Sequence, residues 1–298
     1  MWLRDKVRSK VRVINAALLR EWPLPEPDSE SDKDDRGTVL VAGGSSEVPG
    51  GLILSGLAAL RAGAGKLQLA GPKAIAVGVG AVVLEARVFP LSETSGGSPG
   101  KDAGKELRDI AAAANAVLIG PGMIDEKLAA DFTKAFLRRG PSCSVVIDAA
   151  CIGGLSASKR LSVNAVLTPH AGEMAALLNT RKQKVEKAPE ECAVAAARGL
   201  GAVVVMKGAT TFIAAGDDLF SYSDGHVGLA TSGSGDVLSG IIAGLLARGA
   251  PPDQAAVWGV AIHGAAGNAL ATKVGKIGFL ARELLDHIPR AMQRGVLR

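Results

Sequence analysis

The stretch GLATSGSGDVLSGIIAGLLARG, residues 228–249, indicates the kind of fold, because a run of small residues leads directly into a strongly apolar segment. After residue 236 the large apolar residues recur at helical spacing, at Val237, Leu238, Ile241, Ile242, Leu245 and Leu246. This pattern predicts a buried helix that begins near Gly235 or Asp236. The first backbone N–H groups of such a helix have no partner within the helix and point out of its end.

Asp236 has two interpretations at this point. Gly233 and Gly235 carry no side chains, so a phosphate could approach the free N–H groups closely. A carboxylate beside that phosphate could take the proton of a hydroxyl that attacks the phosphoryl group. In the plainer interpretation Asp236 only caps the helix. A cap alone would need neither the two glycines nor the three hydroxyl residues in front of it.

Strand and helix patterns alternate along most of the chain. Strand patterns lie at residues 38–44, 66–71, 81–89, 116–122, 144–150, 165–173 and 203–208, and helical patterns at 51–65, 107–116, 126–140 and 192–201. Residues 94–106 have the composition of a flexible loop, and residues 210–225 could form a short antiparallel segment. The alternation predicts an α/β fold with a mostly parallel central sheet and helices on both faces.

Chemically unusual residues follow the predicted strands. They are Gly43, Gly44, Gly120–Gly122, Asp148, Thr168–Glu173 and Lys207–Thr211. Ligands of parallel α/β sheets bind beyond the carboxyl ends of the strands, so this clustering favours an enzyme. Each segment also has a structural explanation: a hairpin turn at KGATT, a capping arrangement at TPHAGE, a tight turn at IGPG and a strand-end cap at Asp148.

The chain divides into two parts by composition. Residues 1–36 are predicted to form an N-terminal helix and a polar linker, and residues 37–298 a single domain. The linker, residues 21–37, is polar and rich in proline. The net charge of +5 comes mainly from basic residues near the two ends, which we interpret as solvated helical faces.

The overall composition excludes several classes of function. Aromatic residues make up only 3% of the chain, which disfavours a base-stacking surface for nucleic acid. No apolar run is long enough to cross a membrane. The three cysteines and four histidines form no paired metal motif, so we expect no metal centre made of these residues. An odd number of cysteines also fits a reducing compartment, and we expect a cytoplasmic protein.

Taken together, the segments resemble one family, the ADP- or ATP-dependent NAD(P)H-hydrate dehydratases, which have a ribokinase-like fold. The matching segments occur in the family's order: GTVLVAGGS, AALRAGAG, IGPG, VIDA, LTPHAGEM, KGATT, TSGSGDVLSGIIAGLLARG, HGAAGNALA and GFLARELLDHIPRAM. They extend from about residue 33 to about residue 292. The ordered set is specific, although no single motif would be.

The resemblance implies a hydro-lyase that repairs a damaged metabolite. NADH or NADPH that has taken up water across a nicotinamide double bond is phosphorylated on the new hydroxyl by ADP or ATP with Mg²⁺, and loss of phosphate restores the double bond. Asp236 would be the catalytic base and would also contact the hydrate. Gly235 would form part of the anion site. The family also implies a homo-oligomer.

The same resemblance assigns further binding residues. The adenine nucleotide would be bound by Lys207, Gly208, Ala209, Thr210 and Thr211 together with Gly235. The hydrate would be bound by Ala64, Gly122 and His170. No protein ligand for a resident metal is implied, and neither nucleic acid nor a membrane is an expected partner.

Two rival functions remain compatible with the sequence. A ribokinase-like kinase for a sugar or a vitamin alcohol shares the helix start and the phosphoryl chemistry, but would release a stable phosphorylated product. A non-catalytic nucleotide-binding module would bind adenine nucleotide and release no phosphate. The TPHAGEM and GPG segments favour the dehydratase over both.

Overall fold

A computed structural model describes residues 11–293, and it contains one ten-stranded sheet in the order β1-β10-β9-β8-β7-β6-β5-β2-β3-β4. Within the described chain β9 is the antiparallel member, and the neighbouring strands on either side of it run in one direction. The predicted α/β class with a mostly parallel sheet is confirmed. None of the described helices has the length and apolarity that a membrane span requires.

The first half of the chain builds β1 to β6. The elements are β1 (Arg12–Val13), α1 (Ala16–Glu21), β2 (Thr38–Ala42), α2 (Gly50–Arg61), β3 (Lys66–Pro72), α3 (Lys73–Val82), β4 (Ala86–Leu91), α4 (Lys101–Ala111), β5 (Ala116–Ile119), α5 (Glu126–Leu137) and β6 (Ser144–Ile147). A 3₁₀ turn, η1 (Ala149–Gly154), follows β6.

The second half completes the sheet and adds three long helices. Its elements are β7 (Ala165–Leu167), α6 (Ala171–Leu177), α7 (Lys182–Lys187), α8 (Pro189–Leu200), β8 (Val203–Met206), β9 (Thr211–Ala215), β10 (Asp218–Tyr222), η2 (Val227–Leu229), α9 (Ser234–Ala247), α10 (Pro252–Lys273) and α11 (Ala281–Met292). Helix α8 shows the expected end signals, with Pro189 at its start and Gly201 in a left-handed conformation after its end.

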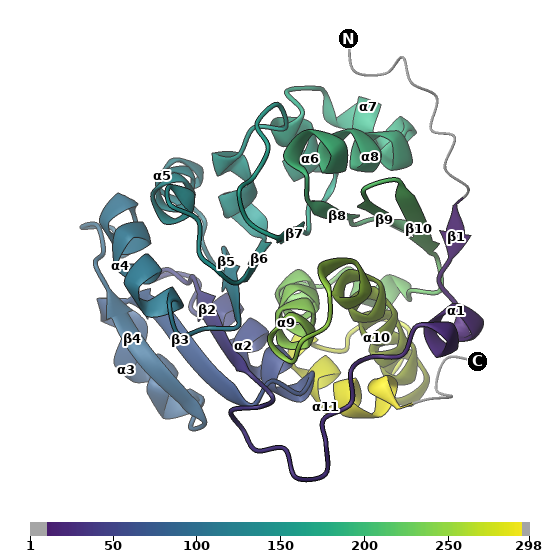
Figure 1. Ribbon diagram of the computed structural model, residues 1–298, viewed down its shortest axis with the longest axis horizontal. Coiled ribbons are helices and arrows are strands. Elements are labelled where there is room, and N and C mark those ends of the chain that lie inside the picture. The colour runs from purple at the N-terminus through teal and green to yellow at the C-terminus, as the bar shows by residue number, and fades with distance from the viewer. Residues whose placement is uncertain (1–10, 294–298) are drawn as a thin grey trace.

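Hydrophobic cores form on both faces of the sheet. In β2 the side chains of Val39 and Val41 pack on the side of α2, α9, α10 and α11, whereas Leu40 and Ala42 pack on the side of α4, α5 and α8. This alternation follows from the twofold side-chain period of a strand. Figure 1 shows α9, α10 and α11 together on one side of the sheet and α5, α6 and α8 on the other.

Small residues hold α9 closely against α2. A methyl group at Gly240 would collide with the backbone carbonyl of Ser55, and one at Gly244 with that of Ala59. The two helices pack along one another at these glycines. The apolar stripe predicted for residues 237–246 is therefore buried, and this packing fixes where the amino end of α9 lies.

The leading segment differs from the expected helix and linker. In its described part, residues 12–13 form β1, which pairs in parallel with β10 at the edge of the sheet. The helix in residues 11–36 is α1, whose cap is Asn15. Many of the terminal basic residues interpreted above as parts of solvated helical faces, at positions 4, 6, 8, 10, 294 and 298, lie outside the described residues. The boundary at residue 36 stays a prediction.

Two local predictions were partly wrong. Residues 81–89 were expected to form a strand, but α3 extends to Val82 and β4 begins only at Ala86. Residues 94–106 were expected to be a loop, but α4 begins at Lys101 with Asp102 in its first turn. Valine-rich sequence favours a strand and glycine favours a loop by intrinsic propensity, and neither preference decides the structure here.

Candidate active site

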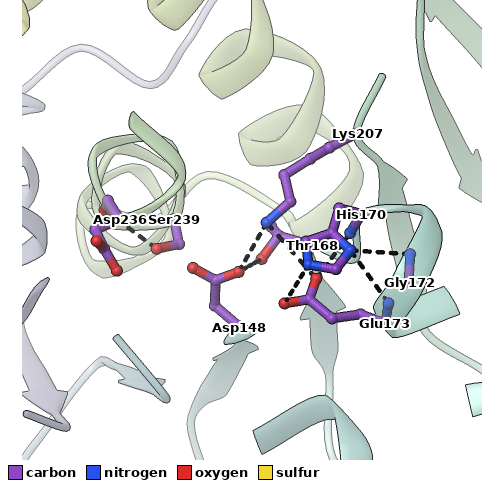
Figure 2. Close-up of polar contacts among 8 residues, drawn as sticks. All are labelled: Asp148, Thr168, His170, Gly172, Glu173, Lys207, Asp236 and Ser239. Atoms are coloured by element: carbon purple, nitrogen blue, oxygen red, sulfur yellow. Dashed lines mark hydrogen bonds and ion pairs between the residues drawn. The ribbon is translucent and has the colours of Figure 1, made fainter. Parts of the chain in front are cut away.

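The carboxyl ends of three neighbouring strands bring together the charged residues of the site. Asp148 follows β6, Thr168 follows β7 and Lys207 follows β8. The Thr168 hydroxyl donates a hydrogen bond to Asp148 Oδ1 at 2.6 Å. Figure 2 shows these side chains converging, with Asp236 on α9 nearby. Because the strands are parallel and adjacent, residues separated by about sixty positions in the chain become neighbours.

Lys207 is the central cation of this group. Its Nζ lies 3.2 Å from Asp148 Oδ1 and 3.9 Å from Glu173 Oε2, while the side chain of Asp148 is only 3% exposed. Burial alone lowers the pKa of Lys207, but the charges of Asp148 and Glu173 outweigh burial and hold it above its usual value. Lys207 therefore stays protonated and can attract a phosphate.

The amino end of α9 is open toward Lys207. The N-cap is Gly233, in a left-handed conformation at φ +85°, and it has no side chain to cap the helix. A methyl group at Gly235 would stand 3.5 Å from Lys207 Nζ, so the ammonium lies just beyond the first turn. Free N–H groups and a cation at one helix end make a suitable anion site.

Asp236 lies in the first turn of α9 rather than at its cap. Among the described residues no hydrogen bond joins its carboxylate to a backbone N–H, and its backbone carbonyl accepts a hydrogen bond from Ser239 Oγ at 3.1 Å. Burial, together with the charge of Asp148, raises the pKa of Asp236 to about 7 against the opposing effect of Lys207. A carboxylate with such a pKa can both accept and hold a proton near neutral pH.

His170 has a clear structural role. It is the N-cap of α6, where its Nδ1 accepts hydrogen bonds from the N–H groups of Gly172 (3.0 Å) and Glu173 (3.2 Å). Glu173 Oε2 accepts in return from the backbone N–H of His170 at 2.8 Å. This is the capping arrangement expected as an alternative for TPHAGE. The imidazole is nevertheless 61% exposed and faces the same region as Lys207 (Figure 2), and its Nε2 lies 3.5 Å from Glu173 Oε1.

Gly122 lies in the turn after β5, whose backbone packs closely against other glycine-containing segments. It adopts φ +72°, and a side chain there would collide with the carbonyl of Val48. Gly51 at the start of α2 packs directly on the backbone of Gly122, and Gly43 on that of Pro121. The tight turn expected for IGPG is therefore present, at the same carboxyl edge as Asp148.

Ala64 is not brought to this edge. It lies between the end of α2 and the start of β3, so the length of β3 separates it from the carboxyl ends of the strands. It is buried, its N–H donates to the carbonyl of Ala59, and nearby Lys66 forms an ion pair with Asp34. The resemblance assigned Ala64 to the hydrate, but α2 runs back along the sheet and places it near the amino ends of the strands.

A cavity of about 730 Å³ adjoins the anion site. Its lining includes the site residues His170, Lys207, Gly208, Ala209, Thr211 and Gly235, together with Tyr222, His226, Val227, Leu229, Ser234, Leu238, Val260, His263 and Gly264. The volume suits a small organic ligand. The predicted nucleotide residues thus line one cavity, whereas Thr210 lies at its turn without being part of the lining.

Three cavity residues were missed by sequence reasoning or were not singled out. Ser234 Oγ lies 2.9 Å from His263 Nε2, and Ser234 is only 4% exposed. Burial lowers the pKa of His263 to about 4, so its ring is neutral. Tyr222 ends β10 and is 5% exposed. His263 lies in a stretch of small residues, HGAAGNA, and this pattern could have identified it from the sequence. No comparable sequence pattern surrounds Tyr222.

The side chains of this site could hold a metal ion only together with a bound ligand that supplies further metal-binding atoms. Among residues 11–293 no group of three or more His, Cys, Asp or Glu side chains could hold a metal ion. Mg²⁺, however, is usually bound by one or two carboxylates and the phosphates of a nucleotide. Asp148 and Asp236 provide two carboxylates close enough to influence each other's charge.

Comparison with known proteins gives a consistent result. A family profile described as NAD(P)H-hydrate dehydratase matches residues 39–290. A protein of Xanthomonas campestris pv. campestris named ADP-dependent (S)-NAD(P)H-hydrate dehydratase is 45% identical over 289 residues, which cover 96% of this chain and 97% of that protein. The chain spans about half the length of the similar bifunctional NAD(P)H-hydrate repair enzymes, such as 54% of the one from Moorella thermoacetica.

Solved structures agree with the sequence comparison. The ADP/ATP-dependent NAD(P)H-hydrate dehydratase of Bacillus subtilis, co-crystallized with ATP/Mg²⁺, superposes with a TM-score of 0.82 and 30% identity over 95% of this chain and 98% of that chain. A ribokinase-like superfamily protein from Enterococcus faecalis V583 gives a TM-score of 0.80 and 26% identity, covering 95% of both chains. The ribokinase-like fold that the resemblance implied is confirmed.

Proposed function

The chain belongs to the NAD(P)H-hydrate dehydratase family, and from this premise we propose how its own residues carry out the ADP- or ATP-dependent dehydration of (S)-NAD(P)H-hydrate. The observation that carries the proposal is Asp236. A half-buried carboxylate with a pKa of about 7 lies in the first turn of α9, beside the anion site and facing Lys207. Such an environment is typical of a catalytic acid or base.

Asp236 acts as the general base in the first step. The hydroxyl of the hydrate loses its proton to the Asp236 carboxylate while its oxygen bonds to the terminal phosphorus of the nucleotide. The bond from that phosphorus to the bridging oxygen breaks, and the shortened nucleotide keeps the electron pair. In the second step the phosphorylated carbon loses phosphate and the neighbouring carbon loses a proton, which restores the double bond.

The start of α9 and Lys207 stabilise the transferred phosphoryl group. The free N–H groups of the first turn, opened by Gly233 and Gly235, donate to phosphate oxygens. Lys207 adds a positive charge that Asp148 and Glu173 keep in place. Because these groups are fixed before the reaction, they stabilise developing charge without reorganising.

Mg²⁺ is the cofactor of this proposal, and its support is the solved relative that was crystallized with ATP/Mg²⁺. The carboxylates of Asp148 and Asp236 would hold the ion together with the nucleotide phosphates. When bound, the ion would neutralise part of the phosphate charge.

The two substrates occupy different sides of this centre. The nucleotide enters the cavity lined by Lys207, Gly208, Ala209 and Thr211, with Thr210 at the tip of the turn. The hydrate approaches from the side of His170 and Gly122. The His170 imidazole is 61% exposed and so can reach the hydrate, and Gly122 lies at the same carboxyl end of the sheet.

Two further points follow the family and the composition. We expect a homo-oligomer, as the resemblance implies. We also expect the protein in the cytoplasm, because Cys143, Cys151 and Cys192 are all free thiols, which suits a reducing compartment.

A reconstitution experiment tests the function. The protein is incubated with chemically prepared NADH-hydrate, ADP or ATP, and Mg²⁺, and the absorbance of reduced nicotinamide is followed together with release of inorganic phosphate. We expect both signals to rise in equal amounts. A stable phosphorylated product without recovery of NADH would instead establish the kinase, and nucleotide binding with no phosphate release would establish a binding module.

A further inference from the structure

We propose that Glu173 is a positioning residue for the hydrate: its carboxylate holds the imidazole of His170 in the orientation that the hydrate meets, and Lys207 anchors that carboxylate. The inference rests on the proposed function, because it takes His170 as a residue of the hydrate side. It gives Glu173 a role beyond the cap of α6 and beyond keeping Lys207 in place.

One carboxylate contacts groups on both sides of the site. Glu173 Oε2 accepts a hydrogen bond from the backbone N–H of His170 at 2.8 Å and lies 3.9 Å from Lys207 Nζ. Glu173 Oε1 lies 3.5 Å from His170 Nε2. In Figure 2 dashed lines lead from the Glu173 carboxylate to His170 and to Lys207. The side chain of Glu173 is 18% exposed and that of His170 is 61% exposed, so a mostly buried carboxylate lies against a mostly exposed ring.

Both nitrogens of the His170 ring are constrained. Nδ1 accepts hydrogen bonds from the backbone N–H groups of Gly172 and Glu173, so in the neutral ring the proton is on Nε2. The carboxylate next to Nε2 favours the same arrangement, because it attracts a proton at that nitrogen. At 3.5 Å the contact is longer than an ordinary N–H···O hydrogen bond, so Glu173 acts on the ring through its charge. The orientation of the ring is therefore set at both nitrogens.

Lys207 anchors the carboxylate from the nucleotide side. Lys207 follows β8 and α6 follows β7, and these two strands are neighbours in the sheet. Although burial lowers the pKa of Lys207, the charges of Asp148 and Glu173 hold it above its usual value. Lys207 therefore stays a cation and attracts the Glu173 carboxylate. A residue of the nucleotide side thus helps to place a ring of the hydrate side.

The cap of α6 does not need the charge of Glu173. The residue three positions after an N-cap accepts a hydrogen bond from the backbone N–H of the cap, and glutamine does this as glutamate does. Glu283 has the same task in α11, where its Oε2 accepts from the backbone N–H of Leu280 at 2.6 Å. Within residues 11–293 Glu283 forms no ion pair with a cation. The two glutamates share a capping role and differ in the contacts of their charge.

The experiment compares Glu173→Gln with wild type in the repair assay, with NADH-hydrate varied at saturating ADP and Mg²⁺. Charge pairs with an exposed partner are weak, so we expect the KM for the hydrate to rise about two- to fivefold, with kcat near that of wild type. ADP affinity, measured by titration calorimetry, should not fall, because Asp148 lies closer to Lys207 and still holds it. The melting temperature should fall only slightly, because glutamine keeps the hydrogen bond of the cap.

Glu283→Gln is the matched control. It makes the same change at the same position of a capping arrangement, without an imidazole or a lysine paired to the charge. We expect the same small change in melting temperature as for Glu173→Gln, and a KM for the hydrate equal to that of wild type.

A double-mutant cycle shows whether Glu173 acts through His170. His170→Asn keeps a good capping side chain and removes the imidazole. In that background Glu173→Gln should leave the KM for the hydrate unchanged, because no ring remains to be held. A glutamate that touched the hydrate directly would instead change the KM by the same factor in both backgrounds.

The outcomes separate this inference from the proposed function. If wild type does not repair NADH-hydrate, the proposed function itself is wrong. If wild type repairs it and Glu173→Gln has the KM of wild type, Glu173 serves the cap alone and the inference is wrong. An effect of the same size in Glu283→Gln, or in the His170→Asn background, would also overturn it. So would a melting temperature of Glu173→Gln far below that of Glu283→Gln, because the effect would then be one of stability.

Discussion

Asp236 gives the most direct test of the mechanism at the scale of a residue, because asparagine keeps its shape and removes its basicity. Loss of a general base reduces the rate by about two to four orders of magnitude. We therefore expect Asp236→Asn to repair the hydrate at least about a hundredfold more slowly while it still binds nucleotide. Rates are measured through the recovery of NADH absorbance. Turnover near that of wild type would exclude Asp236 as the base.

The same substitution has a predictable effect on stability. Burial raises the pKa of Asp236 from 3.8 to about 7 in the folded state. Between these values the unfolded chain has released the proton while the folded protein still holds it, so this carboxyl lowers the stability of wild type progressively as the pH rises. Asp148 and Lys207 are the charged groups that face it.

Asparagine does not titrate, so the stability advantage of Asp236→Asn over wild type should grow between about pH 4 and pH 7 and stay constant above. Urea unfolding at pH 5 and at pH 8 measures the difference. An advantage independent of pH would show that the carboxyl has an ordinary pKa in the folded protein.

His170 combines two roles that substitutions can separate. His170→Ala removes the cap of α6, for which a loss of about 0.5–2 kcal/mol of stability is typical, and should also raise the KM for the hydrate. His170→Asn restores a good capping side chain but not the imidazole Nε2, so it should recover stability and keep the high KM. Normal hydrate kinetics in either variant would leave His170 with the capping role alone.

At the scale of elements, the contact between α2 and α9 holds the catalytic helix in place. Gly244→Ala would push a methyl group into the Ala59 carbonyl, and overpacking of this kind costs about 1–3 kcal/mol. Displacement of α9 would also move Asp236 relative to Lys207, so we expect turnover to fall. Urea unfolding and the repair assay measure the two effects.

Gly78→Ala is the control for that prediction. Gly78 is exposed in α3, and a methyl group added there would have no atom from outside its own stretch of helix within 4 Å, so alanine should stabilise the helix by about 0.5–1 kcal/mol. Equal stability of the Gly244→Ala and Gly78→Ala variants would show that the two helices can separate without penalty.

At the scale of the whole molecule, the nucleotide cavity joins elements that are far apart in the chain. The turn after β8, the end of β10, η2, α9 and α10 all contribute to it. A ligand that binds only this assembled state stabilises the entire fold, by about 2.7 kcal/mol at a hundred times its Kd. ADP or ATP should thus raise the melting temperature in a concentration-dependent way. No shift at millimolar nucleotide would contradict the assignment of the cavity.

The sequence by itself determined the α/β class, the order of most elements and the start of α9 near residue 235. These features depend on local patterns: a twofold or 3.6-residue apolar period, glycines at turns, and small residues before a helix. Where local propensity was misleading, as in the valine-rich end of α3 and the glycine-containing start of α4, the prediction was wrong. The ordered set of motifs also indicated the family to which the chain belongs.

Only the tertiary structure decided which of the candidate residues meet. The parallel strand order brings Asp148, Thr168 and Lys207 together at the carboxyl ends of the strands. Helix α2 places Ala64 at their amino ends. The pKa of Asp236 depends on burial and on charges from β6 and β8, and the contact between Glu173 and Lys207 depends on β7 and β8 being neighbours. Desolvation and charge interactions depend on distances in space, and those between residues far apart in the chain are fixed only when the sheet and its helices have packed.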